Sequence, residues 1–301
     1  MKLGLNLSND ERLIDGKKPR FSDFKEIVQT AEQMGFDSFW LADHLLWRTP
    51  DTEERGFWES LTFLSGLAAV TSRIQLGPSV ACASFRNPAL LAKMAASLDE
   101  ISQGRFVLGL GAGWYEPEYQ AFGYPFDHLA SRFEEALQII LPLLRDGHMD
   151  FTGKYYQARN AVLRPRGPSA GRIPIWIGAT GPRILQLTAR YADAWVFTGW
   201  GKRFKADRIA GEYTKLLAAC EQVGRDPATI ELTAITEVEF LAPGQARDPD
   251  DGGISGDAEE IAQELRAFAE AGVQHLTVII QPEGLSGLSQ FARVMELLKH
   301  W

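Results

Sequence analysis

Cysteine is nearly absent from this sequence. The 301 residues include only Cys82 and Cys220, which lie far apart and without CxxC spacing. A disulfide framework needs an even set of closely spaced cysteines, and a zinc site needs clustered ligands. Neither is indicated, so we expect two free, partly buried thiols and no metal site.

Long apolar runs and a surplus of basic residues are also missing. No stretch approaches the roughly 20 apolar residues that span a bilayer, and Met1-Lys2 leads into a strand pattern rather than a signal peptide. The net charge of -8 and the pI near 5.3 disfavour a nucleic-acid or anionic membrane surface. The composition therefore predicts a cytoplasmic protein whose partners are small molecules.

The chain does contain a regular alternation of short apolar strands and segments with helical periodicity. The predicted strands are 2–7, 37–41, 74–80, 105–110, 174–178, 194–197, 230–241 and 275–280. Each is followed by a helical pattern, and the rhythm is interrupted by insertions at about 146–173 and 243–257. Eight such units predict a single (β/α)8 TIM barrel domain over residues 1–301, with an open α/β sheet as the alternative.

Local signals predict several helix starts. Ser22 or Asp23 can cap the first helix, and Trp58 is the first apolar position of the second. Asn87 is expected to cap a further helix, with Pro88 at its first position. These assignments fix where the strands between the helices must end.

Chemistry in such a barrel belongs at the carboxyl ends of the strands. The predicted ends are Asn6, Asp43-His44, Ala83-Ser84, Gly111 to Glu118, Thr180-Gly181, Thr198, Glu237 and Gln281. His44 is the one histidine of five at such an end, and an imidazole can move a proton near neutral pH. We predict that His44 and Asp43 are catalytic, with Asp43 either orienting the imidazole or capping the next segment.

The sequence GRFVLGLGAGWYEPE at residues 104–118 leads from a strand into alternating glycines. The glycines suggest a G-x-G-x-x-G dinucleotide loop, but the third glycine position is Trp114, and we expect no helix to begin at 115–117. Glycines at a strand end also let a flat group approach the backbone closely. We favour that interpretation for Gly111 and Gly113; a merely tight strand exit is the alternative.

Tryptophans are frequent around the predicted strand ends. Trp40 and Trp195 alternate within strands and are predicted to pack in the core. Trp47, Trp114 and Trp200 lie just beyond strands, where a flat ligand could stack on them.

An anion site is predicted where the fifth strand meets its helix. The helix begins after Ala179, Thr180 and Gly181, and free amides at a helix start favour a phosphate. Arg183 could add charge. A helix start without a ligand is the alternative.

Three segments carry a resemblance to a known family: FDSFWLADHLLW (36–47), RIQLGPSVACASFRNPALLAKMAASLDEISQGRFVLGLGAGWYEPEY (73–119) and IPIWIGATGPRILQLTARYADAW (173–195). In this order they resemble the luciferase-like oxidoreductases. That (β/α)8 family uses flavin or deazaflavin and includes bacterial luciferase and deazaflavin-dependent sugar-phosphate dehydrogenases. The resemblance covers nearly the whole chain.

The resemblance implies a cofactor site with a bulge, often a non-proline cis peptide, after the third strand. The implied ring and phosphate contacts are Asn6, Ser79, Val80, Ala81, Gly111, Gly113, Trp114, Ala179, Thr180, Gly181 and Thr198. His44 would face the reactive ring, and Trp47, Glu118 and Trp200 would line the substrate pocket. A homodimer is also implied.

The resemblance favours coenzyme F420, a deazaflavin that passes hydrides, over FMN. Reduced FMN with O2, in a monooxygenase, is the alternative. Trp114 stands where the sugar-phosphate dehydrogenases carry an acid, which argues against that substrate class. More remote alternatives are a sugar-phosphate isomerase or hydrolase on a TIM barrel, with Glu116 or Glu118 paired to Glu237 or Glu239, and a binding protein without turnover.

Overall fold

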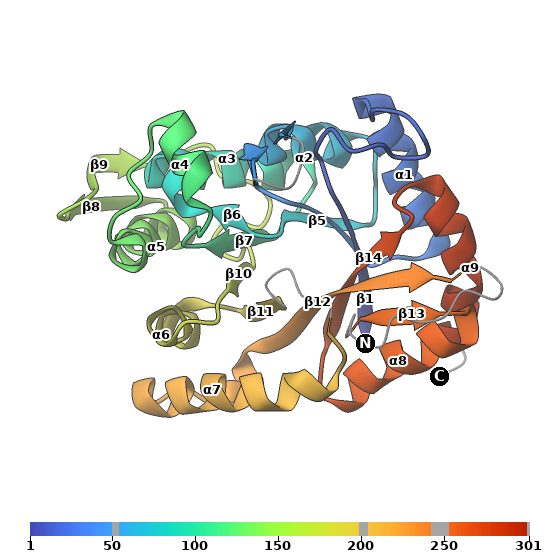
Figure 1. Cartoon of the computed structure of the whole chain (residues 1–301). Coiled ribbons are helices and arrows are strands. Elements are labelled where there is room, and N and C mark those ends of the chain that lie inside the picture. The colour runs from blue at the N-terminus through green and yellow to red at the C-terminus, as the bar shows by residue number, and fades with distance from the viewer. Residues whose placement is uncertain (50–53, 199–203, 242–252, 300–301) are drawn as a thin grey trace. The chain divides into compact units, whose positions relative to one another are not determined.

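The computed structural model describes residues 1–49, 54–198, 204–241 and 253–299 (Figure 1). The chain divides into two compact units. The first unit comprises residues 1–7, 12–40 and 178–301, and the second comprises 8–11 and 41–177. None of the helices in the described ranges is long and apolar enough to cross a membrane. Trp200 lies outside the described residues.

The first unit is built on a parallel sheet. Its strands, in spatial order, are β2 (Ser38–Leu41), β1 (Lys2–Leu7), β14 (His275–Gln281), β12 (Glu231–Phe240) and β11 (Ala194–Thr198), with β13 (Ile254–Gly256) paired to β12. Leu3 stands opposite Leu276, and Val196 stands opposite Thr233. The strands are buried at nearly every position, as expected for a parallel sheet covered on both faces.

Helices follow the strands of the first unit. They are α1 (Phe21–Met34), α6 (Pro182–Tyr191), α7 (Asp207–Val223), α8 (Ala258–Glu270) and α9 (Leu285–Lys299), with a 3-10 turn, η2 (Pro227–Thr229), after α7. Helix α6 packs on α7, and α9 packs on α1 and α8. The predicted core tryptophans are confirmed, since Trp40 and Trp195 are fully buried.

The second unit repeats the alternation of strand and helix. Its parallel strands are β5 (Gln75–Pro78), β6 (Ala81–Cys82), β7 (Leu108–Gly111) and β10 (Ile175–Gly178), and its helical segments are α2 (Ser60–Ala69), η1 (Ala83–Phe85), α3 (Pro88–Ile101), α4 (Glu116–Phe122) and α5 (Leu129–Asp146). Strand β7 pairs with both β6 and β10, and Leu76 of β5 bridges to Phe106.

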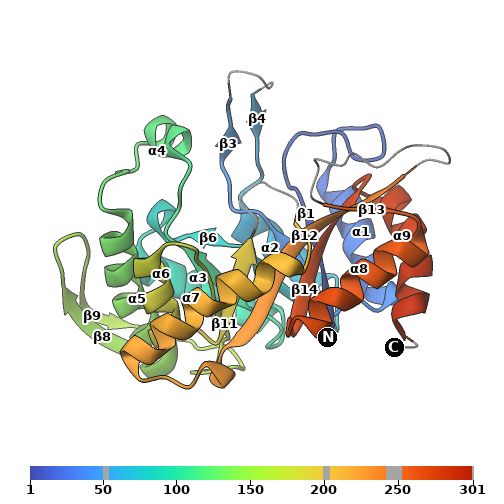
Figure 2. The same cartoon turned by 60° about the horizontal axis from the view of Figure 1, so that its bottom comes forward.

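Two antiparallel hairpins complete the second unit. Strands β3 (Leu46–Trp47) and β4 (Arg55–Gly56) form one of them, which stands out clearly in Figure 2. Strands β8 (His148–Thr152) and β9 (Gln157–Val162) form the other, at the predicted insertion.

Three local predictions were wrong. Helix α1 begins at Phe21 after Arg20, and Asp23 lies in its first turn, where its carboxylate accepts a hydrogen bond from the Arg20 N–H at 2.7 Å. Trp58 precedes α2, is 52% exposed and stacks on Phe63 at 5.3 Å. A helix, α4, does begin at Glu116, because a proline in the first turn costs no intrahelical hydrogen bond.

Other local signals are confirmed. Helix α3 has Asn87 as its cap, with the side-chain oxygen accepting from the N–H groups of Ala89 and Leu90. Pro88 occupies the first turn of that helix, as predicted. Both cysteines are buried free thiols.

Candidate active site

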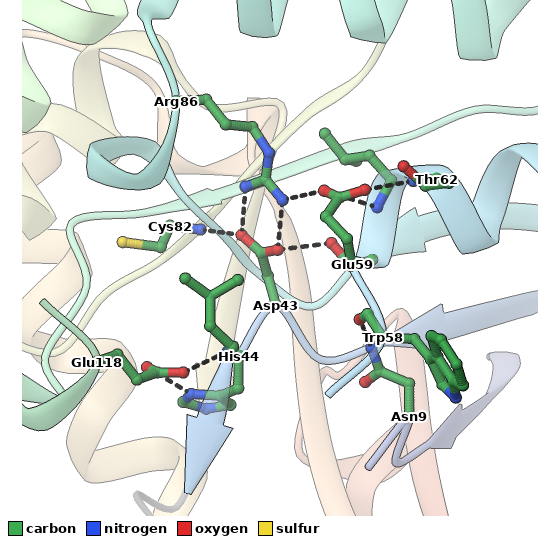
Figure 3. Close-up of polar contacts among 12 residues, drawn as sticks. Asn9, Asp43, His44, Trp58, Glu59, Thr62, Cys82, Arg86 and Glu118 are labelled. Atoms are coloured by element: carbon green, nitrogen blue, oxygen red, sulfur yellow. Dashed lines mark hydrogen bonds and ion pairs between the residues drawn. The ribbon is translucent and has the colours of Figure 1, made fainter. Parts of the chain in front are cut away.

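His44 follows strand β2, and a carboxylate from a distant helix holds it. Its Nδ1 lies 2.9 Å from Oε2 of Glu118, a residue of α4 (Figure 3). The Glu118 side chain is 2% exposed and the His44 side chain is 23% exposed. The imidazole therefore combines a buried anchor with partial access to solvent.

Glu118 also binds the backbone that follows His44. Its Oε1 accepts hydrogen bonds from the N–H groups of Leu45 at 2.5 Å and Leu46 at 3.2 Å. Glu118 is predicted to line a substrate pocket, but both of its oxygens are bound to the segment 44–46.

Four aromatic rings surround the His44 imidazole. Ring centroids lie 5.7 Å away for Trp47, 5.4 Å for Phe57, 5.9 Å for Trp114 and 6.3 Å for Tyr115. Trp47 stacks on Tyr115 at 4.6 Å, and Trp114 meets Trp47 edge-on at 5.7 Å. We call Trp47, Phe57, Trp114 and Tyr115 the aromatic group.

Backbone contacts hold the aromatic group in place. The Arg48 N–H donates to the Tyr115 hydroxyl at 2.8 Å, and that hydroxyl donates to the Arg48 carbonyl. Trp114 remains 46% exposed, although aromatic side chains of this size are usually buried. The residues predicted from the sequence, Trp47 and Trp114, therefore do meet His44.

Asp43 does not contact the imidazole but belongs to a separate buried ion network (Figure 3). Its two oxygens accept from Arg86 at 2.7 Å each, from the Ser60 hydroxyl at 2.6 Å and from the Cys82 N–H at 2.8 Å. Arg86 also contacts Glu59. Burial acts to lower the pKa of Arg86, but its two carboxylate partners outweigh it and raise the pKa. The carboxylate that contacts the His44 imidazole is that of Glu118, not that of Asp43.

Sequence reasoning missed Arg86, Phe57 and Tyr115. Arg86 had a usable signal, since it is the one charge in the otherwise apolar and small-residue stretch that precedes α3. Phe57 and Tyr115 had no comparable signal, because isolated aromatic residues usually pack in a core.

Gly113 is explained by neighbours within its own unit. It has a φ of 82°, and a Cβ there would lie 1.8 Å from the Tyr119 hydroxyl and 2.7 Å from the Cys82 sulfur. Cys82 Sγ and the Tyr119 hydroxyl are 3.0 Å apart, and burial raises the pKa of the Cys82 thiol to about 12. The thiol is therefore a packing group with no reactive thiolate near neutral pH.

Strand β5 ends in the bulge that the resemblance implies. The peptide between Ser79 and Val80 is cis, and the Ser79 N–H donates to the Leu41 carbonyl at 2.8 Å. A Cβ on Gly109 would lie 2.2 Å from the carbonyl oxygen of Pro78. Strand β7 therefore passes so close to the end of β5 that only a glycine fits at position 109. Gly111 ends β7 opposite Cys82, next to the buried Ala81.

The predicted anion site lies at the start of α6 in the first unit. Gly181 is the N-cap residue, and a Cβ there would meet no atom within 4 Å. The carbonyl of Ala179 accepts from the Trp195 indole at 2.8 Å. The anion site at this helix start stays a prediction.

The remaining predicted residues are at strand ends of the first unit. Asn6 is buried near the end of β1, and Thr198 is half-buried at the end of β11. Their role in binding a cofactor stays a prediction.

The arrangement of strands and helices matches solved enzymes along its whole length. An F420-dependent secondary alcohol dehydrogenase, solved with an F420-acetone adduct, superposes with a TM-score of 0.81 at 20% identity, covering 99% of this chain and 98% of that one. The fold is a luciferase-like (β/α)8 TIM barrel, as the sequence predicted.

The sequence pattern described as "luciferase-like monooxygenase" matches residues 1–242. The chain belongs to this family and is an oxidoreductase. It is 34% identical over 226 residues to pyrimidine monooxygenase RutA of Allorhizobium ampelinum, covering 72% of this chain but only 60% of that protein. It is 30% identical over 308 residues to phthiodiolone/phenolphthiodiolone dimycocerosates ketoreductase of Mycobacterium bovis, covering 90% of this chain and 75% of that protein.

Proposed function

We propose that the protein is an F420-dependent oxidoreductase in which hydride passes between the deazaflavin and a small organic substrate while His44 exchanges a proton. The observation that carries the proposal is the imidazole held by a buried carboxylate among four aromatic rings. Similarity to an F420-dependent secondary alcohol dehydrogenase and to a mycobacterial ketoreductase supports the same chemistry.

The residues of this chain fit such a cofactor in two places. The start of α6, with open space at Gly181, suits a phosphate. In the second unit, the proposed ring contacts are the cis peptide of Ser79 and Val80, with Gly111 and Trp114. Bound deazaflavin would supply a carbon centre that accepts or donates hydride.

His44 would handle the proton that accompanies hydride transfer. When an alcohol is oxidised, its C–H bond breaks with the electron pair leaving as hydride, and its O–H proton passes to the imidazole as the C=O bond forms. Reduction of a ketone runs the same steps backwards, so the imidazole must be protonated beforehand. A histidine suits both directions because it titrates near neutral pH.

The aromatic group points to an uncharged, largely apolar substrate. Trp47, Phe57, Trp114 and Tyr115 offer ring surfaces beside His44, and the charged side chain at this place, Glu118, is already bound. Phosphate recognition needs cationic side chains or free amides. We therefore propose an alcohol or ketone rather than a sugar phosphate, and the occupied Glu118 also weakens the hydrolase alternative.

An FMN-dependent monooxygenase is the second candidate. It is favoured by the pyrimidine monooxygenases among the relatives, although the alignment spans about 60% of the first of them. In that case reduced FMN would react with O2, and His44 would assist proton movement in the same position.

Cofactor titration tests the proposal. The purified protein is titrated with F420 and with FMN, each oxidised and reduced, and binding is followed by cofactor fluorescence. Turnover of reduced F420 with a panel of ketones under argon supports the first function. O2-dependent turnover with reduced FMN supports the second, and binding of neither cofactor refutes both.

We further propose that the chain works as one barrel domain, as a cytoplasmic homodimer acting on small molecules. Light scattering coupled to size-exclusion chromatography would measure the assembly, and a mass equal to one chain would contradict the dimer.

A further inference from the structure

We propose that Glu118 is a positioning residue that sets the tautomer of His44, so that Nε2 is the ring nitrogen that exchanges the proton. The inference concerns how His44 is prepared for its work, and it rests on the proposed function only for the direction of the proton. Glu118 acts through the imidazole and needs no contact with substrate or cofactor.

The contacts of Glu118 leave one arrangement of hydrogens. An ionised carboxylate has acceptor sites only. Its Oε1 accepts from the backbone N–H groups of Leu45 and Leu46, and its Oε2 lies 2.9 Å from Nδ1 of His44. Nδ1 must then carry the hydrogen of that bond, and in the neutral ring Nε2 carries the lone pair.

Helix α4 keeps Glu118 from rotating away. The Glu118 N–H donates to the Tyr115 carbonyl at 3.2 Å, and Tyr115 is bound through its hydroxyl to Arg48. The next residue, Tyr119, is fully buried and donates to the Ala112 carbonyl at 3.1 Å. The carboxylate is thus fixed from both sides along the chain.

Asp43 cannot replace Glu118 in this role. Both of its oxygens are bound to Arg86, with Ser60 and the Cys82 N–H as further donors. It is adjacent to His44 in sequence, yet its side chain serves a different network. The structure therefore assigns the tautomer to an acid 74 residues away.

Replacing the carboxylate by an amide inverts the hydrogen bond. In Glu118→Gln the amide oxygen can still accept from the Leu45 and Leu46 N–H groups, which leaves the NH2 group facing Nδ1. An NH2 group only donates, so Nδ1 must become the acceptor and the hydrogen must move to Nε2. A wrong tautomer of this kind lowers turnover by about 10⁴ in a serine protease whose orienting aspartate is changed to asparagine.

The test reads the tautomer directly. The full chain is labelled with ¹⁵N-histidine, and the imidazole nitrogens are recorded by NMR without cofactor, with the signals of His44 assigned by their loss in His44→Gln. Wild-type protein should show a protonated Nδ1 in neutral His44, and Glu118→Gln should show a protonated Nε2. Its turnover should fall by about 10² to 10⁴, with KM changed by less than about threefold.

Glu116→Gln is the matched control. Glu116 lies in the same helical turn and is exposed, and the change removes the same charge. It should leave both the tautomer and turnover unchanged. Glu118→Ala removes the partner without offering a donor, so its His44 signals should show a mixture of both tautomers.

The outcomes separate this inference from the proposed function. A protonated Nε2 in the wild type, or no change of tautomer in Glu118→Gln, would overturn the positioning role whatever the enzyme catalyses. The predicted NMR result in a protein that binds neither cofactor would support the positioning role and refute the proposed function. Circular dichroism of each variant shows whether a loss of turnover is a loss of fold.

Discussion

His44 and His275, in different units, use the same side chain in opposite ways. His44 is partly exposed and bound to the carboxylate of Glu118. His275 is fully buried, and its Nε2 lies 2.7 Å from the Ser38 hydroxyl, which accepts from the Trp40 indole at 2.7 Å. Burial, with a smaller contribution from Lys2, lowers the pKa of His275 to about 3.

The difference teaches what prepares a histidine for proton exchange. His275, with a hydroxyl partner inside the core, is a neutral imidazole that links two strands. A carboxylate partner can hold either the neutral ring or the imidazolium, so the proton can come and go. The carboxylate of Glu231 lies 3.9 Å from Nδ1 of His275, beyond hydrogen-bond distance. A carboxylate at hydrogen-bond distance and access to solvent therefore distinguish His44 from His275.

Removing His44 should have the largest effect on turnover, and it tests directly whether His44 exchanges the proton. His44→Ala is expected to lower kcat/KM by about 10²- to 10⁴-fold, the range of general acid-base catalysis, because it removes the imidazole that we propose exchanges the proton. The free energy of unfolding should fall by about 1 to 3 kcal/mol, since Oε2 of the buried Glu118 loses its hydrogen-bond partner. Steady-state kinetics and urea denaturation measure the two; retained turnover would remove His44 from the mechanism.

Removing Asp43 should affect stability more than any other single change near His44. In Asp43→Ala the guanidinium of Arg86 keeps only Glu59 as a carboxylate partner, and breaking a buried pair costs about 3 to 5 kcal/mol. If stability falls while the NMR signals of His44 stay unchanged, the ion network of Asp43 is independent of the contact between His44 and Glu118. Urea denaturation measures the stability; a loss under 1 kcal/mol would show that the ion network is dispensable.

Gly109 in the second unit and Gly181 in the first differ in how closely other atoms approach their Cα. In Gly109→Ala the new Cβ would lie 2.2 Å from the Pro78 oxygen, so we expect a loss of about 1 to 3 kcal/mol from overpacking. Gly181→Ala is the matched change in open space at an ordinary φ of -75°, and should alter stability by less than about 0.5 kcal/mol. Thermal and urea unfolding compare the pair; equal stability would contradict the close approach at Gly109.

Between pH 7 and pH 5 the pH dependence of stability should come mainly from His275, because carboxylates with lowered pKa values contribute only at lower pH. Its pKa is about 3 in the folded chain and near 6.5 when unfolded, so between these values the unfolded state binds more protons. Stability contributed by the neutral ring is therefore complete above pH 6.5 and falls by up to about 1.4 kcal/mol per pH unit as the pH decreases toward 3. Urea denaturation at pH 7, 6, 5 and 4 measures this, and His275→Gln should flatten the slope; an unchanged slope would assign it to other groups.

The barrel and the position of His44 could be predicted because both depend on local pattern. Apolar strands alternate with helices of the right period, and a strand end places His44 whatever its neighbours are. The partner of His44 could not be predicted in the same way. Adjacent residues at a strand exit point in different directions, so Asp43 contacts Arg86 rather than the imidazole, and Glu118 is brought to His44 by tertiary packing.

Helix α4 shows the same limit. The sequence Tyr115-Glu116-Pro117 predicts no helix start, although proline is acceptable in a first turn and α4 begins at Glu116. The helix is only seven residues long and its anchors, Cys82 and Ala112, lie before it in the chain. Its stability therefore comes from contacts that no local pattern contains.

The two oxygens of the Glu118 carboxylate bind different parts of the site. One oxygen holds the backbone where β3 begins, and the other holds the imidazole that we propose exchanges the proton. The position of the β3–β4 hairpin and the protonation geometry of His44 therefore cannot vary independently. Members of the family could change their reactivity by lengthening or tilting this hairpin, with every catalytic residue left in place.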